Sequence, residues 1–460
     1  MSSNRRRRCI LPTAENWLRA SPASGLLRSF DGGVEASATT YRPERYAAFA
    51  EPVPEAGPII ARGAGLSYAA ASFRQGGSTI DMQCFDRILA FDGENGTVEA
   101  EAGITMASLQ EFLSKGGWYL PVQPGHGRIT LGGCIGADVH GKNPAVDGNF
   151  SSSVVGMRLF NPDVGTREIT AASAPELFAA TCGGYGLTGI IVSARLATRR
   201  LPCTTLLVKA VPVADPIEGG KTLRAEAPEN DIVYSWHDFT VAEGPGLVFV
   251  GRFDREAAGA SSDPSRPIAR SPRLGGAFPI RLHARWTTRV LNAVYHRLNR
   301  PAADLRRLEL RRALFPIEGR EAYFRLFGVK GFHEYQALVP DETYPDYVRE
   351  VRALGKRHDI AITLASGKAF AGDSRLLQFG GKGICFAINL PRTNRSPAML
   401  GDLDRLLVAV GGRPNIIKDS RLPQAVVAAC YPEYERFRTL LRAADPARRF
   451  RSELSERLGL

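Results

Sequence analysis

The sequence predicts an α+β protein that is divided into two domains. A chain of 460 residues is too long for one ordinary hydrophobic core, so two domains are expected. Short apolar strands alternate with helices up to about residue 200, and a second group of strands and helices follows over residues 201–415. Hydrophobic residues make up 44% and charged residues 23% of the chain, which is typical of a soluble globular protein.

The individual elements follow from short apolar runs and from helical periodicity. In the first part, the pattern predicts a helix over 106–115 and strands over 78–82, 97–101 and 190–196. In the middle part, it predicts helices over 344–358 and 398–410 and strands over 206–211, 247–250 and 384–390. No internal repeat accompanies these elements.

The most informative segment is 124–143, in which six of the 20 positions are glycine. Glycine lets backbone N–H groups approach a ligand closely, and successive inward-facing N–H groups form a concavity that suits a diphosphate. A tight turn between two strands is the competing interpretation, but it accounts poorly for so long a run. The segment therefore predicts a site for an anionic ligand.

Two further glycine clusters lie in the same half of the chain, at 58–68 and 182–191. The first is a short buried strand that leads into a glycine turn, but it lacks the third glycine of a Rossmann fingerprint. No Gly-Lys-Ser/Thr sequence of a P-loop is present. Three such clusters separated by strands and helices indicate one composite binding site.

Together these motifs resemble the FAD domain of the vanillyl-alcohol-oxidase type. The resemblance rests on Arg62-Gly-x-Gly-x-Ser-Tyr68, Pro124-Gly125 with Thr130-Leu-Gly-Gly133, His140-Gly-Lys-Asn143 and Gly186-Leu-Thr-Gly-Ile-Ile191. It continues into Tyr335-Gln336, Gly383-Ile-Cys385, Lys418-Asp-Ser-Arg421 and Asp445-Pro-x-x-x-Phe450. Within the family, the chain is most similar to the decaprenylphosphoryl-β-D-ribose 2′-oxidase-like flavoproteins.

The resemblance implies a two-domain fold with a discontinuous FAD-binding domain. That domain would comprise 1–200, with 416–460 returning to it. Residues 201–415 would form a sheet-based substrate-binding domain that contains a basic mobile segment at 257–303. Some relatives tether FAD through a histidine in the first glycine turn, where this chain has Leu66, so the resemblance implies non-covalent FAD.

The resemblance also implies the residues of the site. Lys418 and Gln336 are the expected catalytic residues, and Cys385, Lys142, Trp236 and Lys368 are expected to bind the substrate. The expected cofactor-binding residues are Arg62, Gly63, Ala64, Gly65, Ser67, Tyr68, Gly125, Thr130, Leu131, Gly132, Gly133, Ala137, Asp138, Val139, His140, Ile191 and Asn415.

The residues alone leave other roles open for several of these positions. Lys418 could be a surface lysine paired with Asp419, because lysines are usually exposed. Gln336 could be an exposed strand residue, and Cys385 a small buried hydrophobe. Two departures concern the flavin contact and the substrate pocket: Asn415 and Leu314 stand where the relative that the chain most resembles carries tyrosine.

The activity implied by the resemblance is FAD-dependent oxidation of a secondary sugar hydroxyl. The expected substrate is a lipid-linked sugar phosphate, polyprenylphosphoryl ribose, oxidised at the 2′-OH to the 2-keto sugar. A separate NAD(P)H-dependent keto-reductase would complete the epimerisation to arabinose for arabinan or cell-envelope synthesis. Two alternatives stay open: a soluble alditol or aldonolactone oxidase on the same fold, and a basic lipid- or nucleic-acid-binding protein that keeps only a glycine-rich scaffold.

The net charge of +12 is concentrated in one segment. Eight arginines and no acidic residue lie within 264–303. Residues 282–298 form a predicted helix whose apolar stripe is Leu282, Trp286, Val290, Val294 and Leu298. A basic amphipathic helix with a tryptophan is typical of a membrane-surface contact. The alternative is an ordinary surface helix whose apolar stripe packs on the protein.

The remaining composition narrows the class of protein. Seven scattered cysteines without a Cys-x-x-Cys pair favour a reducing compartment, and the dispersed histidines predict no metal site. No nucleic-acid-binding motif is present, so no nucleic acid is expected as a partner. The basic N-terminus lacks the apolar core of a signal peptide, and no apolar run reaches 18 residues. A cytoplasmic location is therefore expected, with peripheral contact at the inner face of the membrane.

Overall fold

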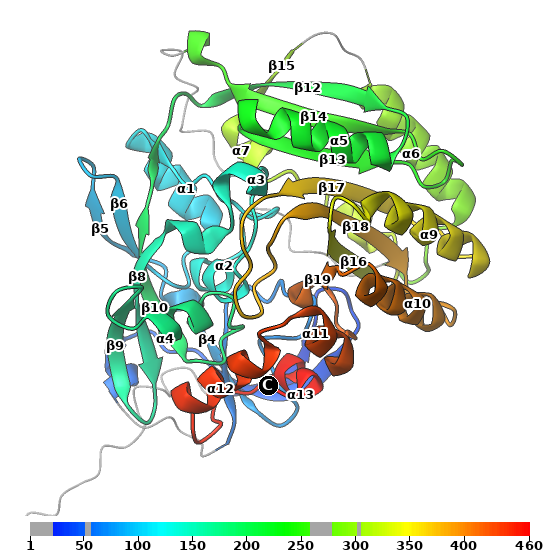
Figure 1. Cartoon of the computed structure of the whole chain (residues 1–460). Coiled ribbons are helices and arrows are strands. Elements are labelled where there is room, and N and C mark those ends of the chain that lie inside the picture. The colour runs from blue at the N-terminus through cyan, green and yellow to red at the C-terminus, as the bar shows by residue number, and fades with distance from the viewer. Residues whose placement is uncertain (1–21, 51–56, 258–277, 301–304) are drawn as a thin grey trace, which may run out of the picture.

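The computed structural model describes residues 22–50, 57–257, 278–300 and 305–460. Two smaller sheets formed before residue 200 lie on one side of the molecule, and an eight-stranded sheet formed after residue 204 lies on the other (Figure 1). Mixed helices and strands are thus present throughout, as an α+β chain requires. The exact division into two domains stays a prediction.

The first part of the chain forms a four-stranded and a five-stranded sheet. In the four-stranded sheet, β2, β4 and β3 are parallel and β1 is antiparallel. Its order is β1 (Ala23–Arg28), β2 (Glu35–Tyr41), β4 (Ser78–Asp81), β3 (Ile59–Arg62). The five-stranded sheet is antiparallel, in the order β5 (Ile88–Asp92), β6 (Thr97–Glu101), β10 (Ile190–Ala197), β8 (Val154–Asn161), β9 (Gly165–Thr170).

Short helices and a two-stranded ribbon complete this part. The ribbon pairs β7 (Trp118–Tyr119) with β11 (Arg199–Arg200). The helices are α1 (Met106–Lys115), α2 (Leu131–Ala137), α3 (Pro144–Asp147) and α4 (Pro175–Thr181). Thr105 caps α1 by accepting a hydrogen bond from the Ser108 N–H, which fixes where the helix begins.

The second part is dominated by an antiparallel sheet of eight strands. Their order is β15 (Arg306–Glu309), β12 (Thr205–Val213), β14 (Gly246–Phe253), β13 (Ile232–His237), β17 (Leu364–Phe370), β18 (Gly383–Pro391), β16 (Phe332–Val339), β19 (Arg413–Pro414). One face is covered by α5 (Pro216–Glu226), α9 (Tyr344–Arg357) and α10 (Ser396–Ala409) (Figure 1). The other helices of this part are α6 (Arg285–Asn299), α7 (Leu310–Leu314) and α8 (Ala322–Arg325).

Strand alternation sorts the side chains of the large sheet onto its two faces. On β16, Tyr335, Ala337 and Val339 belong to the buried core that includes α9 and α10. Because successive side chains on a strand point to opposite faces, Glu334 and Gln336 lie on the other face. That face, the one not covered by α5, α9 and α10, carries the candidate site.

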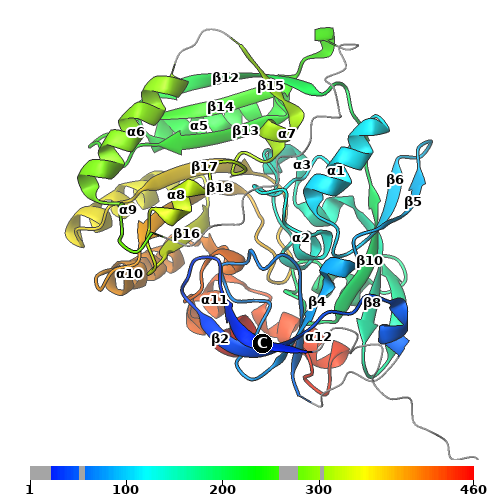
Figure 2. The ribbon, with the colours of Figure 1, turned by 180° about the vertical axis from the view of Figure 1, so that it is seen from behind.

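The C-terminal tail packs back against the first part of the chain. Its helices are α11 (Gln424–Cys430), α12 (Tyr434–Ala444) and α13 (Glu453–Leu458). The Ile59 N–H donates to the Arg449 carbonyl at 2.7 Å, and the Arg451 N–H donates to the Ile59 carbonyl at 3.1 Å. The tail therefore runs beside β3, and Figure 2 shows it next to β2 and β4. The assignment of 416–460 to a discontinuous FAD-binding domain stays a prediction.

The predicted elements are present, and one alternative is wrong. The predicted bounds of α1 and β6 are those observed, and the other predicted strands and helices differ by one to three residues at their ends. The predicted basic helix is α6, but its apolar stripe does not pack on the protein: Leu282, Trp286, Val290, Val294 and Leu298 are all exposed. The buried positions of α6 are Thr288 and Asn292. Of the predicted basic mobile segment 257–303, residues 258–277 and 301–303 lie outside the described residues.

Candidate active site

The three glycine clusters meet around α2. The Tyr185 N–H donates to the Gly136 carbonyl at 2.7 Å, and the Gly183 N–H donates to the Ile135 carbonyl at 2.9 Å. Gly63 packs so closely on Thr130 that a Cβ at Gly63 would lie 2.1 Å from the Thr130 Oγ1. The first and third clusters are thus both held against the second, as one composite site requires.

The first glycine turn has a backbone conformation that requires glycine and a buried hydroxyl group that a ligand could bind. Gly65 has a φ of +70°, which disfavours any residue with a side chain, and a Cβ there would lie 2.2 Å from a nitrogen of Arg62. The buried Ser67 Oγ has no hydrogen-bond partner among the described residues. A buried hydroxyl without a partner is costly, so this atom fits a ligand that supplies one.

A network of polar side chains lies where the glycine clusters face the large sheet. The amide oxygen of Gln336 accepts from Asn415 Nδ2 at 3.0 Å, so its NH₂ group faces His140 Nε2 at 2.9 Å and Cys385 Sγ at 3.1 Å. Lys368 Nζ lies 3.2 Å from His140 Nδ1 and donates to the Gly141 carbonyl at 2.8 Å. The fold thus joins five predicted site residues from five segments of the chain.

Lys418 lies at a second centre of charge beside this network. Its Nζ is 3.2 Å from Glu334 Oε1 and 4.2 Å from the centre of the Tyr68 ring. Tyr68 in turn stacks on Phe30, with ring centres 5.0 Å apart. The alternative pairing of Lys418 with Asp419 is not observed, because the Asp419 carboxylate pairs with Arg421 at 2.9 Å. Lys418 is therefore directed at the site.

The comparisons with known proteins agree with this geometry. A family model described as an FAD binding domain matches residues 43–170. Decaprenylphosphoryl-β-D-ribose oxidase of Mycolicibacterium smegmatis is 27% identical over 416 residues, which cover 87% of this chain and 89% of that protein. An uncharacterized protein in the mprA 5′ region of Streptomyces coelicolor is 30% identical over 376 residues, which cover 78% of this chain and all of that protein.

The chain belongs to the vanillyl-alcohol-oxidase-type family of FAD-dependent oxidoreductases. Within that family it is a decaprenylphosphoryl-β-D-ribose-oxidase-like flavoprotein. A lactone dehydrogenase, L-galactono-1,4-lactone dehydrogenase 1 of Oryza sativa, is similar over only 138 residues, or 29% of this chain and 23% of that protein.

The residues expected to hold FAD in this flavoprotein act in two ways. Some build the turns rather than point at a ligand: Asp138, in a left-handed conformation at the end of α2, accepts from the Ser151 N–H at 2.8 Å and from Asn149 at 3.2 Å. Arg62 likewise donates to Ser72 at 2.8 Å. The others lie on or beside the converging clusters: Gly63, Ala64, Gly65, Ser67, Tyr68, Gly125, Thr130, Leu131, Gly132, Gly133, Ala137, Val139, His140 and Ile191. Asn415 contacts the site through Gln336.

Burial and mutual repulsion change the protonation of the flavoprotein's site. Burial, assisted by the nearby Lys418 and opposed by Cys385 and Glu334, lowers the pKa of Lys368 to about 8. Burial likewise lowers the pKa values of Lys142 and His140 well below their usual ranges, and Lys368 adds to both shifts. Burial raises the pKa of Cys385 to about 11, so the thiol is protonated at neutral pH. The site therefore concentrates cationic and neutral groups in a desolvated volume.

One predicted residue lies outside the network, and one residue of the site was not predicted. Trp236 is not part of the network: its ring packs against Tyr295 of α6, with ring centres 4.8 Å apart, so its substrate role stays a prediction. Glu334 was missed, although it pairs with Lys418 and accepts from Asn389 at 3.2 Å. The available signal was its position two residues before Gln336, since alternate strand residues share a face.

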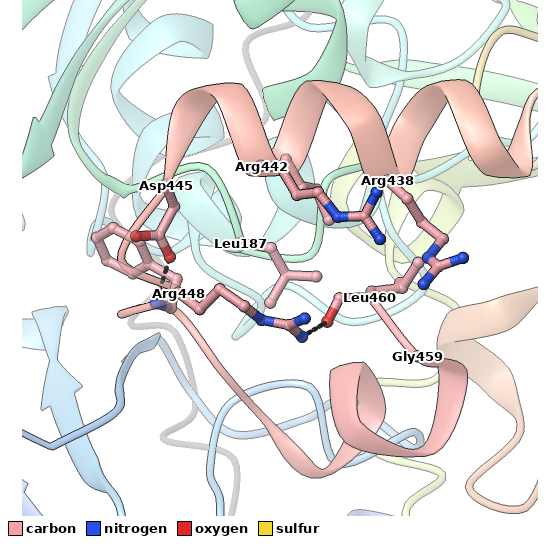
Figure 3. Close-up of a pocket in the computed structure, with 9 residues that line it drawn as sticks. Leu187, Arg438, Arg442, Asp445, Arg448, Gly459 and Leu460 are labelled. Carbon is pink, nitrogen blue, oxygen red and sulfur yellow. Dashed lines mark hydrogen bonds between the residues drawn. The ribbon is translucent and has the colours of Figure 1, made fainter.

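A separate pocket lies at the C-terminal helices and is not part of this site. Figure 3 shows Arg438, Arg442 and Arg448 around Leu460, whose carbonyl oxygen accepts from Arg448 at 2.7 Å.

No group of three or more His, Cys, Asp or Glu side chains that could hold a metal occurs within residues 22–50, 57–257, 278–300 and 305–460.

Proposed function

We propose that this flavoprotein oxidises the 2′-hydroxyl of a ribose carried on a polyprenyl phosphate and yields the 2-keto sugar, with FAD bound non-covalently. The observation that carries the proposal is the group of three lysines, Lys142, Lys368 and Lys418, at the meeting point of the glycine clusters and the large sheet. The similarity to decaprenylphosphoryl-β-D-ribose oxidase over 87% of the chain supports this substrate class.

The reaction removes a hydride from the carbinol carbon and a proton from its hydroxyl. Bound FAD supplies the two-electron acceptor for the hydride. Lys368 is the group suited to accept the proton, because a pKa of about 8 lets a fraction of its side chains be neutral near physiological pH. Lys418 is held by Glu334 and Tyr68, so its ammonium group can orient an anionic or hydroxyl group without rearranging.

The lysines of the site also suit the phosphate group of the proposed substrate. Three lysines share the site, and Glu334 is the carboxylate that pairs with one of them. An anionic group brought into this desolvated site would favour the charged forms of Lys142 and Lys368, whose pKa values burial lowers. The lysines therefore favour ligands that carry phosphate, and free neutral polyols gain nothing from them. A keto product further implies a separate NAD(P)H-dependent keto-reductase, which would reduce the ketone with inverted configuration and complete an epimerisation to arabinose.

A soluble alditol or aldonolactone oxidase is the second candidate. The similarity to L-galactono-1,4-lactone dehydrogenase favours it, but that similarity covers only 29% of the chain. The shared segment of 138 residues is about as long as the match to the FAD binding domain model, residues 43–170. The second candidate is therefore supported over a much smaller part of the chain than the first.

An anaerobic absorbance titration tests the proposal. Purified protein is first precipitated with acid, and FAD that is released into the supernatant shows non-covalent binding. A short-chain polyprenylphosphoryl ribose is then added without oxygen, and bleaching of the flavin band is expected. Bleaching by free alditols or lactones but not by the phosphorylated sugar would assign the second candidate instead. A protein that never binds FAD would contradict both.

A further inference from the structure

Exposed apolar side chains are concentrated in one short segment of the chain. Seventeen large hydrophobic residues are exposed in the described structure. Nine of them belong to α6 and its two flanks: Phe278, Ile280, Leu282, Trp286, Val290, Leu291, Val294, Leu298 and Leu305. Single exposed hydrophobics are ordinary, but a group of this kind on one element marks an interaction surface.

Helix α6 has its polar face turned inward and its apolar face outward. The inward positions are polar or aromatic: Asn292 donates to Asp238 at 2.8 Å, and Tyr295 packs on Trp236. The outward positions recur every fourth residue and are exposed by 71% at Trp286, 55% at Val290 and 51% at Val294. This is the reverse of a helix that packs on a core, so the apolar stripe is built for contact with something outside the protein.

The charges beside the stripe favour an anionic partner. Arg289, Arg297 and Arg300 are exposed, and none of them forms an ion pair within the described part of the chain. Arg285 does pair with Asp359, at 3.2 Å. With 3.6 residues per turn, Arg289 and Arg300 fall along one border of the stripe, and Arg297 falls on the same side of the helix as the stripe itself. An apolar strip with a tryptophan and an arginine border matches the boundary between acyl chains and anionic headgroups.

The helix and the candidate site belong to the same face of the large sheet. Trp236, on which α6 packs, pairs across the sheet with Ser366, two residues before Lys368. Alternate residues of a strand share a face, so Trp236 and Lys368 lie on the same side of the sheet. The other side is covered by α5, α9 and α10 (Figure 1). A partner surface that binds α6 would therefore lie on the same side of the large sheet as the candidate site.

We propose that the outward face of α6 docks the protein onto an anionic lipid bilayer. Trp286, Val290, Val294 and Leu298 enter the interfacial layer, while Arg289, Arg297 and Arg300 contact the anionic headgroups. The contact is peripheral, and no described helix is long and apolar enough to cross a bilayer. The proposal goes beyond the proposed reaction and does not depend on it, because binding to lipid needs no sugar substrate.

Vesicle co-sedimentation of the full-length, FAD-loaded protein tests the proposal. The probes are vesicles of pure phosphatidylcholine and vesicles that contain one quarter phosphatidylglycerol. The apolar variant replaces Trp286, Val290 and Val294 with Gln, and its control replaces the exposed Leu89, Val164 and Val408, which lie on other elements. The charge variant replaces Arg289, Arg297 and Arg300 with Gln. All of these positions are exposed, so the bound flavin and the melting temperature should not change.

The expected result is binding of the natural protein and the control to the anionic vesicles only, weakened by salt. Both the apolar and the charge variants should bind at least about tenfold more weakly, since each arginine at an anionic surface contributes about fivefold. Equal binding by the apolar variant and its control would overturn the proposal. So would equal binding to both kinds of vesicle. Self-association that the apolar variant abolishes, without vesicle binding, would assign the face to a second copy of the chain instead.

Discussion

Glu334 places a carboxylate among the lysines of the site, and its charge influences how Lys368 titrates. Its Oε1 lies 3.2 Å from Lys418 Nζ, and its charge raises the pKa of Lys368, which burial lowers. The Glu334 carboxylate therefore orients Lys418 and favours the protonated form of Lys368.

Replacing Glu334 with Gln should move the pH dependence of flavin reduction. Without the carboxylate the pKa of Lys368 falls, so the limb in which the rate rises with pH should shift to lower pH. The rate on the plateau should fall about tenfold, because Lys418 loses its ion-pair partner. Anaerobic stopped-flow measurements between pH 6 and 10 would test this. Glu342→Gln, at an exposed carboxylate, is the matched control, and an unshifted limb would assign Glu334 a structural role only.

Replacing Lys368 with Met should stabilise the FAD-free protein at neutral pH. The pKa of Lys368 is lowered from 10.5 to about 8, so the unfolded chain binds more protons than the folded one between these values. The free energy of unfolding of the natural protein should therefore rise from pH 8 to 10.5, by roughly 3 kcal/mol from this group.

Urea unfolding at pH 7 and at pH 10.5 would measure this effect. The advantage of Lys368→Met over the natural protein should be large at pH 7 and should shrink as the pH rises. Lys356→Met, at an exposed lysine, should show no such trend. An advantage that does not change with pH would mean that packing, rather than buried charge, sets the stability of this position.

At the residue level, the sequence predicts members of the site but not their partners. Gln336, Cys385 and Lys368 could be named through a family resemblance, but from the residues alone Gln336 could be an exposed strand residue and Cys385 a small buried hydrophobe. The register between β16, β17 and β18, which joins them in one network, depends on long-range pairing that no local pattern encodes. Glu334 was not predicted for the same reason, because its role depends on the ion pair with Lys418, which lies 84 positions later in the sequence.

At the level of elements, the first glycine turn depends on its contact with α2. Gly63→Ala would place a Cβ about 2 Å from the Thr130 Oγ1, so β3 and α2 must separate. The variant should bind FAD roughly tenfold more weakly and lose about 1–3 kcal/mol of stability. FAD titration by fluorescence quenching and thermal unfolding would measure both.

The matched control is Gly57→Ala, six residues earlier, where an added Cβ meets no atom within 4 Å. This control should retain the affinity for FAD and the stability of the natural protein. Unchanged FAD binding by Gly63→Ala would show that the contact with Thr130 is not needed for the cofactor site.

Local periodicity predicted where the elements begin and end better than which way they face. Helix α1 was predicted over its full length from its periodicity, and in the structure the Thr105 cap and Gly116 mark the same ends. Helix α6 was predicted as a helix, but the same periodic stripe fits both a buried and an exposed face. Only its polar contacts to Asp238 and Trp236 determine that the apolar side is outward.

For the molecule as a whole, the candidate site is a junction between separate parts of the chain. His140 comes from the glycine-rich part, Gln336 and Lys368 from the large sheet, and Lys418 from the segment that leads into the C-terminal helices. The sequence could predict that these parts exist, but their meeting depends on how the sheets pack. A ligand held at this junction must therefore stabilise segments that are more than 200 residues apart.

Hydrogen exchange with and without FAD tests this arrangement. FAD binds the folded state, so added FAD should slow amide exchange wherever it or its contacts hold the chain. Protection is expected in 59–68 and 124–143 of the glycine clusters and also in the strands β16 and β17, which carry Gln336 and Lys368. The exposed helix α6 serves as an internal control, because its only role in our interpretation is at a lipid surface. Protection confined to residues 43–170 would mean that the cofactor does not reach the large sheet, and Lys368 could then not take part in the reaction.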